Sequence, residues 1–175
     1  MHVKTAVLIA SALLAIAGCA SSSPPVSAMA PEGVTYIVVR HAEKATDDPR
    51  DPSLSAAGQA RAEALARRFS TTRLTAAYAT AFKRTEQTAL PAATVSGIVI
   101  TTYDASAPAA DFVAQLRRTH ARGNVLVVGH SNTVPGIVAA LCTCTVAPLD
   151  ESRYGDVYEV SIDDGGDATL TESTY

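Results

Sequence analysis

Two histidines and two arginines are the residues of this sequence best suited to chemistry: Arg40 and His41 are adjacent, while Arg84 and His130 stand apart. An arginine side chain can bind two phosphate oxygens at once and stays charged at any relevant pH. A neutral imidazole nitrogen is a competent nucleophile towards phosphorus. If the fold brings these four side chains together, their types suit phosphoryl transfer without a metal.

Short apolar runs precede both histidines. Residues 34–39 and 124–128 are rich in β-branched and aromatic side chains, which is typical of buried strands. Further strands are predicted at residues 76–79 and 98–102, and as a hairpin of residues 157–162 with 168–171. The hairpin predicts an antiparallel pair at one edge of the sheet.

Helical spacing of apolar residues separates these strands. The predicted helices are residues 55–69, 83–94, 109–120 and 133–141. Pro91 is expected to kink or end the second of them. Strands that alternate with helices predict an α/β fold of three layers, with a mostly parallel central sheet and an antiparallel C-terminal edge hairpin.

The expected positions of the four side chains follow from this arrangement. Arg40-His41 and His130 come directly after predicted strands, and Arg84 lies on the helix that follows a third strand. Ligands of such sheets bind beyond the carboxyl ends of the strands. The sequence therefore predicts one anion-binding cluster at that edge.

Four segments of the chain resemble, in the family's order, the motifs of the histidine phosphatase superfamily, also called phosphoglycerate mutase-like. They are residues 40–44 (Arg-His-Ala-Glu-Lys), 54–60 (Leu-Ser-Ala-Ala-Gly-Gln-Ala), 84–89 (Arg-Thr-Glu-Gln-Thr-Ala) and 128–132 (Val-Gly-His-Ser-Asn). Each motif alone is a weak signal, but four in the correct order are specific.

This resemblance implies a role for each of the four residues. His41 would take the phosphoryl group and become phosphohistidine, Arg40 and Arg84 would bind the phosphoryl oxygens, and His130 would stabilise their charge. Water would then hydrolyse the phosphohistidine. The implied activity is metal-independent hydrolysis of phosphate monoesters or anhydrides, with a small phosphorylated substrate and no cofactor.

The general acid that protonates the leaving oxygen is the least determined residue. Asp104, just after a predicted strand, is the candidate, and Asp111 is an alternative that also fits the first turn of a helix. Glu43 could instead orient the nucleophile. Some short relatives of the family have no evident acid, and its absence would favour good leaving groups.

The first 18 residues have the composition of a signal peptide, with Lys4 as their only Lys or Arg and an apolar run too short for a comfortable membrane span. The run ends at residues 16–19 (Ile-Ala-Gly-Cys), which resemble the bacterial lipobox. We therefore expect lipidation at Cys19. The alternative is an ordinary signal peptide that is cleaved after Ala28 or Ala30.

Three parts of the chain follow from this interpretation. Residues 1–18 are a lipoprotein signal peptide, residues 19–32 are a Ser/Pro-rich flexible tether, and residues 33–175 are the histidine phosphatase domain. The lipid on Cys19 would anchor the protein in a membrane of the bacterial cell envelope. Ala20 after the cysteine favours the outer membrane, with the domain facing the periplasm.

Cys142 and Cys144 are separated by one residue. An extended backbone would place their Cα atoms close to the upper limit of about 7 Å for a disulfide. We therefore expect two unbridged small residues after a helix, with a disulfide as the alternative. No further cysteine or histidine lies near them in sequence, so no metal site is predicted.

The charge of the chain limits its partners. A formal net charge of −3 gives no general attraction to nucleic acid, so phosphate binding must be local. A second function remains open: a non-catalytic envelope lipoprotein that binds a phosphorylated ligand in the same pocket. Such a binder needs the arginines but has no need of His41, which favours the enzyme. The sequence does not indicate an oligomeric state.

Overall fold

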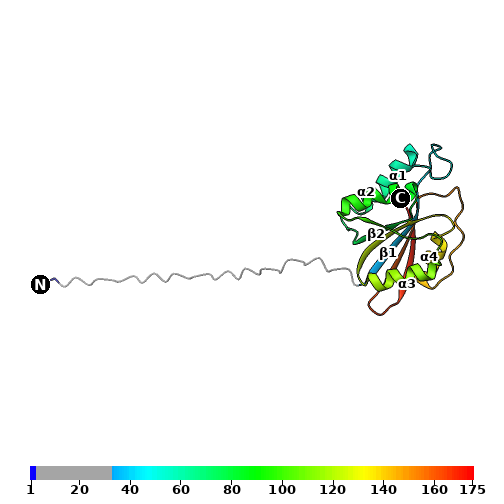
Figure 1. The fold of residues 1–175 in the computed structure, drawn as a ribbon. Helices are drawn as coiled ribbons and strands as arrows, with labels where there is room; N and C mark the ends of the chain where they lie inside the picture. The colour runs from blue at the N-terminus through cyan, green and yellow to red at the C-terminus, as the bar shows by residue number, and fades with distance from the viewer. Residues whose placement is uncertain (3–32) are drawn as a thin grey trace.

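The computed structural model describes residues 1–2 and 33–175, and Figure 1 shows their arrangement. The predicted signal peptide, the tether and the lipidation of Cys19 fall in or next to residues 3–32, outside the described part of the chain. The remaining domain is one central sheet with helices on both faces (Figure 1).

Six strands form the sheet in the order β3-β2-β4-β1-β5-β6. The first four strands of this order pair in parallel, and β5 and β6 continue the sheet in antiparallel pairing. The strands are β1 (Val34–Arg40), β2 (Ala76–Ala79), β3 (Ile100–Thr102), β4 (Gly123–Gly129), β5 (Asp156–Ile162) and β6 (Ala168–Thr174). The predicted mostly parallel sheet with an antiparallel C-terminal edge hairpin is confirmed.

Four helices complete the three layers: α1 (Ala56–Arg68), α2 (Lys83–Ser96), α3 (Ala109–Thr119) and α4 (Val134–Cys142). Helices α1 and α2 cover one face of the sheet, and α3 and α4 cover the other (Figure 1). In the described residues, no helix is long and apolar enough to cross a membrane.

Side-chain alternation along β1 supplies both cores. Tyr36 and Val38 pack with the α3 and α4 side, while Ile37 and Val39 pack with the α1 and α2 side. All four are buried. Each such side chain contributes roughly 1.5–3 kcal/mol relative to an exposed position. The strand that carries Arg40 and His41 is therefore held firmly from both faces.

Helix α2 does not end at Pro91. It continues to Ser96 and stops at Gly97, which adopts the left-handed conformation at φ 71°. Proline removes one backbone hydrogen bond from a helix. Ala89, Ala92 and Ala93, close to Pro91, are buried in the core on the α1 and α2 side of the sheet. This packing holds the helix together across the proline.

The expectation of unbridged cysteines is wrong, because Cys142 and Cys144 form a disulfide. Thr143 between them adopts the left-handed conformation, with φ 54° and ψ 39°. This turn brings the two Cα atoms to 5.2 Å, well inside the range that a disulfide spans. The sequence-based argument assumed an extended backbone, which the end of α4 does not have.

Candidate active site

His41 follows the last residue of β1, at the carboxyl end of the sheet. Its amide donates to the carbonyl oxygen of Gly129 at 2.9 Å, which continues the pairing of β1 with β4. Its Nδ1 lies 2.8 Å from the carbonyl oxygen of Ala42. Because that carbonyl can only accept, Nδ1 carries the proton and Nε2 keeps its lone pair. The ring is therefore oriented as a nucleophile.

The protonation state of His41 agrees with that role. Burial is the main cause that lowers its pKa from an ordinary 6.5 to about 4, and the nearby charges of Arg40 and Arg84 lower the pKa further, against the hydrogen bond to Ala42. The side chain is only 4% exposed. At neutral pH the imidazole is uncharged and able to attack.

His130 comes directly after β4 and faces His41, with 5.3 Å between the ring centroids. Its Nε2 lies 3.0 Å from the hydroxyl of Thr80, and its Nδ1 lies 3.5 Å from Nη2 of Arg84. Burial, followed by the charge of Arg84, lowers the pKa of His130 to about 4. Both predicted histidines thus meet at one site, both in the neutral form.

Threonines connect the histidines to α2. The hydroxyls of Thr80 and Thr85 lie 2.8 Å apart, and the amide of Ala42 donates to the hydroxyl of Thr88 at 3.0 Å. Thr88 in turn donates to the carbonyl oxygen of Arg84 at 2.7 Å. The sequence analysis missed these threonines. Their signal was available, since Thr85 and Thr88 lie three residues apart within the second arginine motif and face one side of the helix.

Arg84 offers unused hydrogen-bond donors to the site. Its Nε and Nη1 are buried without a hydrogen-bond partner, and its nearest acidic group, the carboxylate of Asp51, lies 3.7 Å away. Phe82 stacks against the guanidinium at 4.3 Å. A buried N–H without a partner costs on the order of 1–3 kcal/mol. An anion with several oxygens would remove that cost.

Arg40 differs from the prediction in what it touches. Its Nη1 donates to the backbone oxygens of Asp150, Glu151 and Arg153 at 3.2, 2.8 and 2.9 Å. Its guanidinium also stacks on Tyr154 at 4.2 Å. Only Nε is buried without a partner. Arg40 therefore holds the loop before β5, and it is not among the residues that line the cavity of His41.

Glu151 is a site residue that the sequence analysis missed. One of its carboxylate oxygens accepts from the hydroxyl of Ser131, and the other accepts from Nη2 of Arg40 at 3.0 Å. These two partners lower its pKa, the bond from Ser131 most strongly, so the carboxylate is ionised. Its side chain is 75% exposed. Glu151 lies in a loop distant in sequence from every motif, and no local pattern marks it.

These residues surround an open cavity of about 310 Å³. Both histidines, Arg84, Glu151 and Lys44 line it, together with Phe82, Ala105, Ser131, Asn132 and Thr133. The segment between β3 and α3 is short, so within the described residues it forms no large insertion beside the mouth of the cavity. The cavity can admit a phosphoryl group to Nε2 of His41.

The structure argues against Asp104 as the general acid. Asp104 does not line the cavity that contains His41, although the next residue, Ala105, does. Its carboxylate is exposed and accepts from the amide and hydroxyl of Ser106 at 2.8 and 2.7 Å, and these bonds lower its pKa. A carboxyl group that is ionised at neutral pH is a poor proton donor.

The two other acidic candidates are also placed elsewhere. Asp111 lies exposed in the first turn of α3. Glu43 binds Arg61, whose Nε lies 2.9 Å from both carboxylate oxygens, so Glu43 does not contact the nucleophile. This ion pair ties the nucleophile motif to α1. The close approach also explains Gly58, where a Cβ would meet the carbonyl oxygen of Glu43 at 2.3 Å.

The residues that could bind a metal are few. Among residues 1–2 and 33–175, no group of three or more His, Cys, Asp or Glu side chains is arranged to hold a metal ion. The donors around the cavity are guanidinium and imidazole groups, which suit an anion rather than a cation.

Comparison with solved structures supports the fold. The protein histidine phosphatase SixA in complex with tungstate is 19% identical, with a TM-score of 0.63 over 80% of this chain and 96% of that one. YhfR from Bacillus stearothermophilus is 18% identical, with a TM-score of 0.64 over 79% and 95%. A mycobacterial glucosyl-3-phosphoglycerate phosphatase is 17% identical, with a TM-score of 0.63 over 82% and 98%.

Comparison at the level of sequence finds one matching family model. No curated protein matches the chain. The family model of the histidine phosphatase superfamily (branch 1) matches residues 36–107, which include the nucleophile motif, the start of α1 and the second arginine motif. The fold of the solved structures agrees with that match over four fifths of the chain. Residues 36–107 therefore match the histidine phosphatase superfamily, and the fold of the described domain is similar to that of the solved structures.

Proposed function

We propose that this protein is a phosphatase that hydrolyses phosphate monoesters or anhydrides through a phosphohistidine on His41. The observation that carries the proposal is the pairing of a neutral, oriented imidazole with buried N–H groups that lack partners. These groups are Nε of Arg40 and both Nε and Nη1 of Arg84. Phosphoryl oxygens are acceptors that such donors would bind.

The chemistry would proceed in two displacements at phosphorus. Nε2 of His41 forms a bond to phosphorus while the bond to the leaving oxygen breaks, and the leaving group departs with the electron pair. His130 and Arg84 line the cavity and would face the charge on the phosphoryl oxygens. Removing one such positioned donor from an enzyme typically costs 10²–10³ in rate.

A water molecule would then attack the phosphohistidine and release inorganic phosphate. The ionised carboxylate of Glu151 lines the same cavity and can accept a proton from that water. With Asp104 outside the cavity, the site holds no protonated carboxyl group for the leaving oxygen. The proposed enzyme is therefore fastest with leaving groups that are stable as anions.

The test is hydrolysis of p-nitrophenyl phosphate by the purified protein at pH 4 to 8. Wild type is compared with His41→Ala and with His120→Gln, which changes a histidine outside the cavity. We expect activity in wild type and in the control, and none in His41→Ala. Labelling with a 32P-phosphorylated substrate should trap an acid-labile, base-stable phosphoenzyme. Tight phosphate binding without turnover would support the non-catalytic binder instead.

Vanadate and a metal chelator sharpen the test. Vanadate can form a five-coordinate mimic of the transition state and should inhibit the enzyme. A metal chelator should leave the rate unchanged. A rate that falls with the chelator and returns with an added divalent cation would contradict metal independence.

We further propose that the protein is exported and anchored to the outer membrane, facing the periplasm, by lipid on Cys19. The support is the sequence of residues 1–20 alone. Metabolic labelling with radioactive palmitate tests it. The wild-type chain should carry the label, and Cys19→Ser should not. Label in neither protein would indicate an ordinary cleaved signal peptide.

A further inference from the structure

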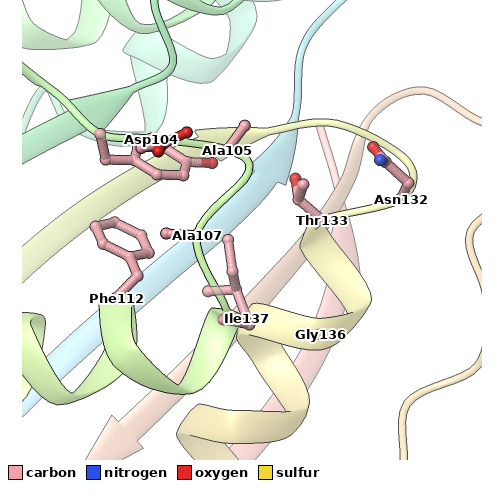
Figure 2. Close-up of a pocket in the computed structure, with 10 residues that line it drawn as sticks. Asp104, Ala105, Ala107, Phe112, Asn132, Thr133, Gly136 and Ile137 are labelled. Carbon is pink, nitrogen blue, oxygen red and sulfur yellow. The ribbon is translucent and has the colours of Figure 1, made fainter.

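We infer that a second cavity beside His41 binds the leaving group, and that it takes one ring-sized group that is uncharged or cationic. The inference rests on the proposed phosphatase activity and adds a substrate class to it. The second cavity, called the side cavity below, lies between the loop after β3 and the first turns of α3 and α4 (Figure 2).

The side cavity shares part of its wall with the cavity that contains His41. Ala105, Asn132 and Thr133 line both. In Figure 2, Asn132 and Thr133 lie at the start of α4, opposite Asp104 and Ala105. A substrate whose phosphoryl group reaches His41 can therefore extend its leaving group into the side cavity.

Size limits what this cavity can accept. Its volume is about 190 Å³. An engineered apolar protein cavity of roughly 150 Å³ binds benzene. One aromatic ring or a group of similar size therefore fits, whereas a nucleoside or a folded protein segment does not.

Apolar side chains form the floor and one wall. Phe112 and Tyr103 stack there with 4.2 Å between ring centroids, and Ile137 is buried beside them. Gly136 leaves space on α4, since a Cβ at this position would meet only the Cβ of Ala109, at 3.6 Å. These surfaces give an apolar or aromatic group contact area on one side, while Asp104, Asn132 and Thr133 make the rest of the lining polar.

Charge distinguishes the two cavities. Lys44 and Arg84 line the cavity of His41, but no Lys or Arg lines the side cavity. Its one charged residue is Asp104 at the mouth, ionised through its bonds from Ser106. A second anionic group on the substrate would meet this carboxylate, while a neutral or cationic group would not. Asp104, first predicted as the general acid, is here a specificity residue.

Binding of phosphonates tests the inference without depending on turnover, because their P–C bond is not hydrolysed. Calorimetry on the full chain compares methylphosphonate, phenylphosphonate and 4-carboxyphenylphosphonate. Burying the ring should make phenylphosphonate bind roughly tenfold more tightly than methylphosphonate. The 4-carboxyphenyl compound should lose most of that gain.

Five variants localise the effect. Gly136→Leu should abolish the preference for phenylphosphonate and leave methylphosphonate binding unchanged, with Gly136→Ala in between. Ala114→Leu, on the exposed side of α3, is the matched control and should change neither. Asp104→Asn should restore binding of the 4-carboxyphenyl compound, while Asp111→Asn, an exposed acid outside the cavity, should not.

The outcomes separate this inference from the proposed activity when the same samples are assayed with p-nitrophenyl phosphate. A ring preference that Gly136→Leu removes, without any hydrolysis, supports the side cavity and rejects the phosphatase. Hydrolysis with equal binding of both phosphonates, or with a preference that survives Gly136→Leu, overturns the side cavity alone. Absence of binding by all three phosphonates overturns it as well.

Discussion

The two sides of the His41 cavity are built differently. On one side, His41 and His130 come from the ends of neighbouring buried strands and are almost fully buried. On the other side, Ser131 and Glu151 come from loops; Ser131 is half-buried and Glu151 is exposed. Loops tolerate change more readily than the elements that they connect. The strand side thus fixes the reacting groups before a substrate binds, and the loop side leaves room for selection and access.

The electrostatics follow the same division. Burial removes charge from the strand side by lowering the pKa of both histidines, so both imidazoles are uncharged at neutral pH. The loop side keeps an ionised carboxylate at Glu151, since water and hydrogen bonds surround it. Arg40 links the two sides, because it is the last residue of β1 and its side chain donates to backbone oxygens of the loop before β5.

The largest effect is expected from Arg84 on α2, whose guanidinium lies 3.5 Å from Nδ1 of His130. Arg84→Ala should lower kcat/KM for p-nitrophenyl phosphate by about 10²–10³, because the buried donors that face the phosphoryl oxygens are lost. Arg84→Lys should recover part of the loss, since it keeps the charge but not the fork. Steady-state kinetics measure both. An unchanged kcat/KM in Arg84→Ala would remove the arginine from the site.

The stability of the fold should depend on pH through the buried histidines His41 and His130. The histidine pKa values of about 4 lie below the ordinary 6.5, so the unfolded chain gains protons first as the pH falls. The stability that these two neutral histidines contribute is therefore fully present above pH 6.5 and is lost as the pH falls from 6.5 to 4. At about 1.4 kcal/mol per pKa unit, the lowered pKa of His41 alone corresponds to roughly 3 kcal/mol, and His130 adds to it.

Denaturant unfolding at pH 7 and pH 4.5 measures this dependence. The double variant His41→Gln/His130→Gln cannot take up these protons and should show a smaller loss of unfolding free energy than wild type. His120→Gln removes one histidine outside the cavity whose pKa burial also lowers, and it should reduce the loss by less than the double variant does. Parallel losses in wild type and in the double variant would contradict the lowered pKa values.

A smaller effect on rate is expected at the hydrogen bond behind His130. Thr80→Val keeps the volume of the side chain but leaves Nε2 of His130 and the hydroxyl of Thr85 without this partner. We expect kcat to fall roughly tenfold with little change in KM, since a neutral hydrogen bond is worth about 1 kcal/mol. Thr119→Val on the exposed end of α3 is the control. A change confined to thermal stability would show that Thr80 only supports the fold.

The smallest effect is expected on the loop side. Glu151→Gln keeps an acceptor for Ser131 and Arg40 but removes the negative charge, so kcat should fall by only about two- to fivefold. In rapid-quench experiments the phosphoenzyme should accumulate, since hydrolysis by water is the step that slows. A loss as large as that of Arg84→Ala would make the loop side equal to the strand side in the reaction.

Prediction from sequence succeeded where local pattern and burial agree. The runs at residues 34–39 and 124–128 lie in β1 and β4, and their β-branched and aromatic composition was enough to place His41 and His130 at one edge. Prediction failed where the neighbours of a residue come from elsewhere in the chain. Pro91 stays helical because of its packing, and the cysteines bridge because Thr143 turns the backbone.

Within the site, residue identity and order along the chain were enough to predict that His41, His130 and Arg84 lie at one cavity, because each of them follows the end of a strand. Only the tertiary structure decided which acid faces the cavity. Glu151 and Asp104 lie in loops whose course is set by long-range contacts, such as the bonds from Arg40 to the loop before β5. No local pattern encodes those contacts, so the sequence alone could not distinguish the two carboxylates.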